Sequence, residues 1–219
     1  MVARALHALA AESRARAIRR GQWLTWATLG YNCLEGLISV IAGLLAGSVA
    51  LVGFGIDSAI EVTASLAALW RLRDDRPERR ASAERRALAI IGGCFFALAA
   101  YVGVEATRAL VHRTPPAESL LGIAVAGASL IVMPLLARAK RAVARTLRSQ
   151  AIRAEARQTD ICVYLSAILL AGLGLNALLG WWWADPLAAV AMVPLIAWEG
   201  RKALQGRAGC DTCVDDSLA

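Results

Sequence analysis

Six long apolar blocks, separated by short charged segments, are the feature that most constrains how this chain can fold. A bilayer core about 30 Å thick needs about 20 apolar residues for each spanning helix. The blocks that we expect to span the membrane are Trp23–Leu45, Val49–Trp70, Leu88–Leu110, Leu120–Leu136, Ile161–Leu179 and Pro186–Trp198. The fifth is expected to begin as helix near Ile152. The sequence therefore predicts an all-α integral membrane bundle of six transmembrane helices.

The segments between the blocks support this division. Gly47 and Ser48 allow a tight turn between the first two helices, and Pro115 and Pro116 break the chain between the third and fourth. Three consecutive tryptophans, residues 181–183, stand at a block edge. Tryptophan gathers at membrane–water interfaces, so we interpret them as an interfacial belt, with packing against a neighbouring loop as the alternative.

The composition narrows the class of protein. Hydrophobic residues make up 58% of the chain, above the roughly 45–50% of soluble domains. The net charge of +7 could indicate a nucleic-acid partner. However, the arginines lie at block edges and are not interleaved with aromatic residues, so we expect no nucleic-acid binding.

The basic residues alternate along the chain in a way that predicts orientation. Of the 24 Lys and Arg residues, 22 lie before Trp23, in 71–86, in 138–157 or after Trp198. The remaining two, Arg108 and Arg113, lie in the connection between the third and fourth blocks. Because basic loops stay in the cytoplasm, both termini are expected there, in a multi-pass protein of the cell inner (plasma) membrane.

Three regions are expected: a cytoplasmic basic segment at 1–22, a six-helix transmembrane domain at 23–203 and a short cytoplasmic tail at 204–219. The N-terminal arginines lead into a long apolar block, so no cleaved signal is expected. The tail holds Cys210 and Cys213, which form half a zinc site. They would capture metal, pair across a dimer or belong to a disordered end. The cysteines inside the blocks are expected to be small hydrophobes, with no disulfide framework.

The strongest chemical signal is the pair Asp57 and Glu61 in the second block. A spacing of four residues places both side chains on one helical face. Two carboxylates that close in a low dielectric disfavour being ionised together, so a proton, a basic partner or a metal cation must relieve them. The nearest basic residue in the block is Arg71, at its end, and no Lys or Arg is expected at that depth. Metal or protons remain, with a protonated, hydrogen-bonded pair as the structural alternative.

Other polar residues fall inside the apolar blocks. Asp160 opens the fifth block, as a site residue or as a helix-terminal acid on a solvated face. Glu35, with Asn32 one turn earlier, either lines the same cavity or bonds between helices. Glu105 is expected to pair with Arg108 near the outer end.

Several of these stretches resemble the cation diffusion facilitator family. In its second helix, that family has a Gly-Ser entry followed by two acids four residues apart. The matching stretches here are Gly47–Leu51, Asp57, Ser58, Glu61 and Ser65 in the second block, Gln158–Asp160 in the fifth, and Gly180–Pro186 and Ala197–Gly200 around the sixth. The resemblance covers nearly the whole membrane region.

The resemblance implies export of zinc or a similar divalent ion, often in exchange for protons, by alternating access in a homodimer. It also implies a metal site built from two residues of the second helix and two of the fifth. Asp57 and Glu61 match the first two and Asp160 the last. The family usually has His or Asp at the remaining position, where this chain has Ala156 beside Glu155, so Glu35 or Asn32 would complete the site.

Zinc is the expected substrate, and manganese, cobalt, iron and cadmium are the alternative substrates. The family's usual C-terminal cytoplasmic domain is expected to be missing, as in a short, divergent member.

The sequence also bears on three other classes of protein: a membrane enzyme, a carrier of another small solute and a non-transporting membrane protein. A membrane enzyme is not expected, because there is no Ser/His/Asp set and His7 and His112 lie outside the blocks. A carrier of another small solute would show Gly or Pro breaks in two matched halves, which are absent. A non-transporting membrane scaffold or regulatory subunit fits the incomplete site.

Overall fold

The computed structural model describes residues 2–73, 77–147 and 150–205, with side chains at 15–63, 65–66, 89–146, 156 and 158–205. Six helices make up almost all of this part, and it contains no strand. The helices are α1 (Val2–Ala46), α2 (Val49–Arg73), α3 (Pro77–His112), α4 (Leu120–Leu147), α5 (Gln150–Leu179) and α6 (Ala184–Leu204). The predicted all-α architecture of six helices is confirmed.

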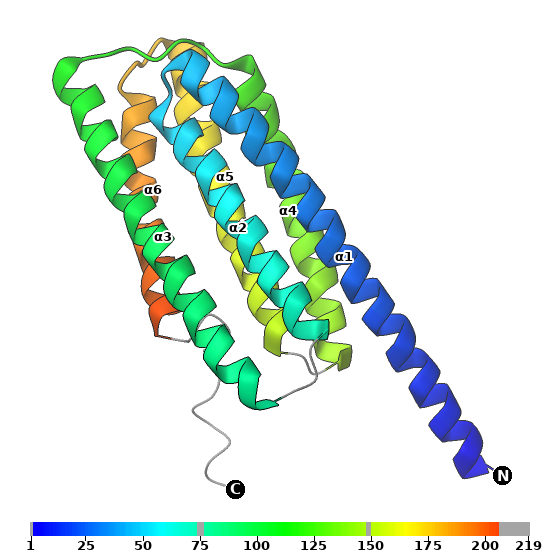
Figure 1. The fold of residues 1–219 in the computed structure, drawn as a ribbon. Coiled ribbons are helices and arrows are strands. Elements are labelled where there is room, and N and C mark those ends of the chain that lie inside the picture. The colour runs from blue at the N-terminus through cyan, green and yellow to red at the C-terminus, as the bar shows by residue number, and fades with distance from the viewer. Residues whose placement is uncertain (1, 74–76, 148–149, 206–219) are drawn as a thin grey trace, which may run out of the picture.

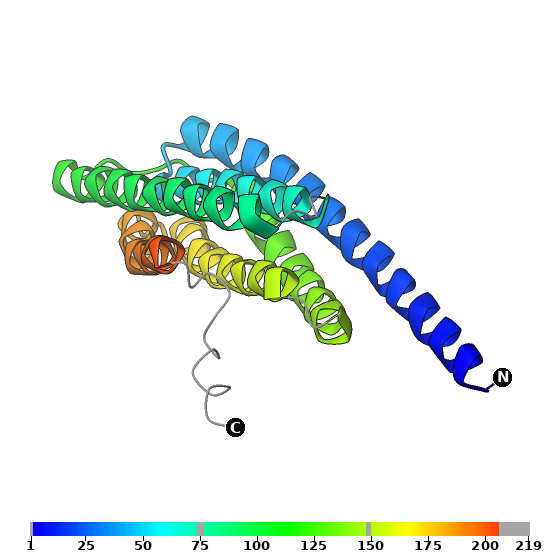
Figure 2. The ribbon, with the colours of Figure 1, turned by 60° about the horizontal axis from the view of Figure 1, so that its bottom comes forward.

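The helices run side by side in alternating directions, and the N-terminal turns of α1 project beyond the bundle (Figure 1). The second view shows α1, α2 and α3 in one layer and α4, α5 and α6 in the other, with α3 packed on α6 and α4 on α5 (Figure 2). Helix α2 contacts α1, α3, α5 and α6, and α5 contacts α2, α4 and α6. The two helices that carry the predicted acids therefore occupy the centre.

The helices are longer than the apolar blocks. Helix α1 begins at Val2, well before Trp23, because the Ala- and Arg-rich segment is built from good helix formers. Helix α2 continues to Arg73, and α3 starts with Pro77, which is favoured at a first helical position. The charged segments thus extend the helices.

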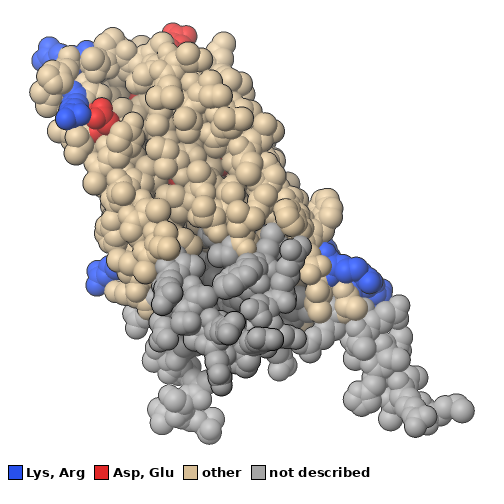
Figure 3. Space-filling view, in the orientation of Figure 1, with Lys and Arg blue, Asp and Glu red and all other residues tan. Residues whose placement is uncertain are grey.

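Among the residues whose side chains the structure describes, four stretches are long and apolar enough to cross a membrane: Ala15–Ala46, Ala89–His112, Leu120–Thr146 and Gln158–Leu179. Large apolar side chains point outward from them, for example Leu45 (83% exposed) and Ile131 (67% exposed). On the face drawn in Figure 3, the coloured charged residues gather toward the ends of the bundle and leave a broad uncharged band. A band of this kind suits lipid rather than water.

Small residues let the helices approach closely in two pairs. Between α1 and α2, a Cβ added at Gly55 would lie 2.7 Å from the Val40 side chain and 3.0 Å from the Gly36 carbonyl oxygen. Between α3 and α6, a Cβ at Gly92 would lie 3.0 Å from the carbonyl oxygen of Gly200. In lipid, where helices gain no hydrophobic attraction for one another, such close van der Waals packing stabilises the bundle.

The turn between α1 and α2 is as tight as predicted. Gly47 has a φ of +65°, which favours glycine, and the backbone N–H of Ser48 donates to the Gly43 carbonyl at 2.9 Å. This turn fixes α2 antiparallel to α1, so the polar residues of both helices meet inside the bundle.

Candidate cation site

Part of the interior of this bundle is polar, beside a larger apolar core. Several buried side chains are acidic, basic or hydrogen-bonding, and they project from α1, α2, α4 and α5 toward one another. The principal ones are Asn32, Glu35, Asp57, Ser58, Glu61, Ser129, Lys140, Thr159 and Cys162. A carboxylate at the centre of a spanning helix costs about 2.5–3.5 kcal/mol on insertion scales, so a cluster of them points to function.

Helix α2 carries the acidic pair. Asp57 is 3% exposed and Glu61 is 4% exposed, and their charges repel each other. The i, i+4 spacing places both on the face that packs into the bundle, as the sequence predicts. The charges of Glu35 and Glu199 also act on Asp57, so this carboxylate faces acids from both α1 and α6.

Helix α1 supplies direct partners to α2. The Asn32 side-chain amide donates to Glu61 Oε2 at 2.6 Å, and the Ser58 hydroxyl donates to Glu35 Oε2 at 2.9 Å. The interhelical bonds considered for Asn32 and Glu35 are therefore present. The amide oxygen of Asn32 (Oδ1) and the second carboxylate oxygen of Glu35 (Oε1) are buried without a hydrogen-bond partner. These two oxygens have acceptor capacity that the protein does not use.

The expectation of no basic residue at this depth is wrong. Lys140 of α4 is 1% exposed, and its ammonium donates to the Thr159 hydroxyl at 3.4 Å. Lys140 and Glu61 also attract each other electrostatically. The sequence suggested a surface position because Lys140 lies among charged residues, but its four-carbon stem carries the ammonium inward.

Asp160 lies at the edge of this interior. Its side chain is 35% exposed and forms an ion pair with Arg141 of α4. Ala156, one turn earlier on α5, is fully buried and supplies no ligand. In the described part of the chain, no three His, Cys, Asp or Glu side chains converge closely enough to hold a metal ion. Cation binding by Asp57, Glu61 and Asp160 together therefore requires Asp160 to leave Arg141 and the side chains to turn.

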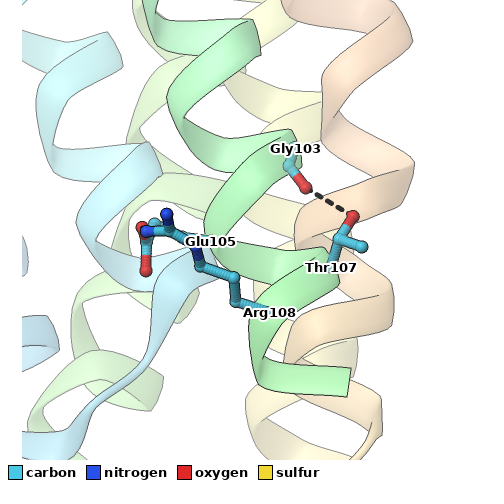
Figure 4. Close-up of polar contacts among 4 residues, drawn as sticks. All are labelled: Gly103, Glu105, Thr107 and Arg108. Atoms are coloured by element: carbon cyan, nitrogen blue, oxygen red, sulfur yellow. Dashed lines mark hydrogen bonds and ion pairs between the residues drawn. The ribbon is translucent and has the colours of Figure 1, made fainter. Parts of the chain in front are cut away.

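Glu105 is separate from this interior. Its Oε1 accepts from Arg108 Nη1 at 2.7 Å, and the Thr107 hydroxyl donates to the Gly103 carbonyl of the preceding turn (Figure 4). The predicted pairing of Glu105 with Arg108 is confirmed. Both side chains are partly exposed, so this pair is a surface contact at one end of α3.

Sequence reasoning gave no role to three buried groups. Besides Lys140, these are Cys162, whose thiol lies 3.9 Å from Glu35 Oε2, and Asp185 at the start of α6. The Ser48 hydroxyl donates to Asp185 Oδ1 at 2.5 Å, which ties the α1–α2 turn to α6. Asp185 lies in the first turn of α6 but does not cap that helix, whose N-cap is Trp183, so no local sequence pattern reveals its contact with Ser48.

Two further predictions, the tryptophan belt and the free cysteines, concern residues outside the cluster or at its edge. Trp181 and Trp183 are exposed and stack with ring centroids 5.0 Å apart, and their place at a membrane interface stays a prediction. Cys33 and Cys94 are exposed thiols and Cys162 is a buried one. Cys210 and Cys213 lie outside the described residues, as do most of the predicted tail.

The donor set is chemically suited to a divalent cation. Carboxylate and amide oxygens are the ligands of hard and borderline divalent ions, and when Glu35, Asp57 and Glu61 are all ionised they carry more negative charge than Lys140 neutralises. The surplus charge, enclosed among apolar helices, gives a desolvated cation a favourable position.

Comparison with known proteins agrees with this chemistry. The sequence matches the family profile of the cation efflux transmembrane domain over residues 26–204. It is 26% identical over 181 residues to the uncharacterized transporter sll1263 of Synechocystis, covering 80% of this chain and 58% of that protein.

Two relatives have names that describe an activity. The chain is 29% identical over 163 residues to the cation-efflux pumps FieF of Salmonella typhi and of Citrobacter koseri. Each match covers 71% of this chain and 54% of the pump, so the chain spans just over half the length of these relatives. Because the profile covers most of its length, the chain belongs to the cation efflux family of membrane transporters, the cation diffusion facilitators.

Proposed function

We propose that this protein exports divalent metal cations, with zinc as the first substrate to test, through the interior between α1, α2 and α5. The observation that carries the proposal is the buried acidic pair Asp57 and Glu61 on a central helix. Two carboxylates enclosed by apolar helices are most stable when a cation shares their charge. The unused oxygens Asn32 Oδ1 and Glu35 Oε1 on the facing helix would add ligands.

Binding would proceed by exchange of partners. In this structure Asp160 is paired with Arg141, and Glu61 accepts from Asn32. An entering cation would draw the carboxylates of Asp57, Glu61 and Asp160 toward itself. Because Asp160 joins the site from α5, its movement would couple cation binding to the packing of α5 against α2 and α4.

Release would depend on protons. Carboxylates bind metal in their deprotonated form, so protonation of the same acids would expel the cation. Rocking of the central helices would expose the site to one side of the membrane and then to the other, as in alternating access. This mechanism makes protons the counter-ion, and export at the inner membrane follows if both termini are cytoplasmic. We also propose that the working unit is a homodimer.

Uptake of zinc into proteoliposomes tests this function. Wild-type protein should load zinc down a gradient, more strongly with an opposing proton gradient. Asp57→Ala should reduce uptake at least about a hundredfold, because a central ligand is lost, and Asp160→Ala should reduce it at least about tenfold.

Glu105→Gln is the matched control, since it also removes one acid from a spanning helix but lies outside the cluster. It should transport like the wild type. Full transport in both Asp57→Ala and Asp160→Ala would refute the site. No transport by the wild type of any divalent cation would instead favour a scaffold or regulatory role.

A further inference from the structure

Lys140 is the only Lys or Arg that is buried among the described side chains. A charged ammonium is costly to bury unless charged or hydrogen-bonding groups compensate it. The proposed transport mechanism gives Lys140 no task, and a methionine or leucine would fill the same space among apolar helices. The burial of this charged side chain therefore needs a physical reason.

The surroundings of Lys140 are acidic and polar. Its ammonium donates to Thr159 on α5 and is attracted by Glu61 on α2, which also interacts with Asp57 and Glu35. The lysine thus reaches from α4 toward both central helices. It brings one positive charge to the carboxylates that the proposed function assigns to the substrate.

Arg141, the residue after Lys140 on α4, brings a positive charge to Asp160, the remaining acid of the proposed site. Arg141 forms an ion pair with Asp160 at the edge of the interior, where both side chains are partly exposed. Consecutive residues of one helix therefore act on two different acids: Lys140 attracts Glu61 of α2 electrostatically, and Arg141 forms an ion pair with Asp160 of α5. In this conformation α4 supplies a positive partner to acids on both central helices.

A divalent cation and an ammonium compete for the same carboxylate charge. Two positive ions held beside one acid in a low dielectric repel each other strongly, so a cation that reaches Glu61 meets the ammonium as a rival. The Thr159 hydroxyl, to which the ammonium already donates, is a neutral partner that holds it on the α5 side when a cation takes the charge of Glu61. Lys140 would then weaken cation binding and help to expel the cation.

We propose that Lys140 is a tethered counter-cation, which neutralises Glu61 while the site is empty, yields to the substrate and thereby sets its affinity and release. The inference rests on the proposed function. It adds a specificity-determining residue on a helix that contributes no ligand: a site with a built-in positive charge selects against monovalent cations, which cannot outcompete it.

Calorimetric titration of the purified full-length chain with zinc chloride tests this proposal. Lys140→Met keeps the length and apolar stem of the side chain and removes the charge. It should bind zinc at least about tenfold more tightly than the wild type, because the rival charge is gone. Arg145→Met, which removes an exposed charge from the same helix, should stay within about twofold.

Transport kinetics separate this role from a structural one. In proteoliposomes, Lys140→Met should lower both the zinc concentration for half-maximal uptake and the maximal rate, because the cation binds better and leaves more slowly. A merely structural lysine would lower the maximal rate without tightening binding. Unchanged or weaker zinc binding in folded Lys140→Met would overturn the proposal.

A second variant covers the case in which Lys140→Met does not fold. Thr159→Val removes the neutral partner of the ammonium and should weaken zinc binding about threefold, and wild-type affinity in this variant would count against the proposal. If neither the wild type nor Lys140→Met binds zinc, cobalt or manganese, the proposed function fails and this inference with it. If the wild type binds, Asp57→Asn does not and Lys140→Met is unchanged, the inference alone fails.

Discussion

Glu61 interacts with polar groups of two neighbouring helices. Asn32 donates to it from α1, and Lys140 attracts it from α4. In a low dielectric each of these contacts matters more than it would in water, and each would have to loosen when a cation arrives. Interactions that stabilise the protein with an empty interior therefore lower its affinity for a cation, because the same side chains take part in both.

The bond from Asn32 can be tested by itself. Asn32→Leu keeps the size of the side chain but leaves Glu61 Oε2 without its donor, which should destabilise the protein by about 1–3 kcal/mol. The measurement is unfolding in mixed micelles with increasing dodecyl sulfate. Thr28→Val is the control, because Thr28 bonds only to the Leu24 carbonyl of its own helix. Equal stability of both variants would mean that the amide contributes nothing to the interior.

Among the helices, α2 is held at its first turn by α6. Ser48 donates to Asp185, and the Leu51 backbone N–H donates to the Ser48 hydroxyl at 3.1 Å. The Asp185 carboxylate also lies near the backbone N–H groups of Val49 and Ala50, where a helix N-terminus favours negative charge. One acid of α6 thus caps α2 and fixes its end.

Removing this cap should loosen α2 without touching the cation site. Ser48→Ala should destabilise the protein by about 1.5–3 kcal/mol, the usual contribution of a hydrogen bond to a charged group. Hydrogen exchange should accelerate at the amides of residues 49–52, and zinc affinity should stay close to wild type. Thr107→Val, which removes an exposed hydroxyl bonded within its own helix, serves as the comparison. Unaltered exchange at 49–52 would contradict the capping role.

The element list was predictable, and the helix pairing was less so. Six apolar blocks define the helices, and Gly47 at a short turn places α1 beside α2. The packing of α3 on α6 joins segments far apart in sequence and depends on Gly92 and Gly200, whose role no local pattern reveals. The acids of α2 could be placed from their spacing. The inward direction of Lys140 and the pairing of Asp160 with Arg141 depend on which helices are neighbours, so periodicity alone could not give them.

For the molecule as a whole, the alternation of basic and nonbasic connections predicts that the α3–α4 connection faces away from the cytoplasm. Glu118 in this connection is exposed. In a variant lacking Cys33, Cys94, Cys210 and Cys213, Glu118→Cys should react with a membrane-impermeant maleimide added to intact cells. A cysteine at Ser149, between α4 and α5, should react only after the cells are opened. The reverse pattern would refute the orientation.

The central claim is that the buried acids between α1 and α2 hold a divalent cation. Its most direct test is anomalous diffraction from crystals of the full chain grown with cadmium. We expect an anomalous peak at coordination distance, about 2.0–2.6 Å, from carboxylate oxygens of Asp57 and Glu61, and no such peak in Asp57→Asn crystals. Cadmium bound elsewhere, with none beside these two residues, would contradict it.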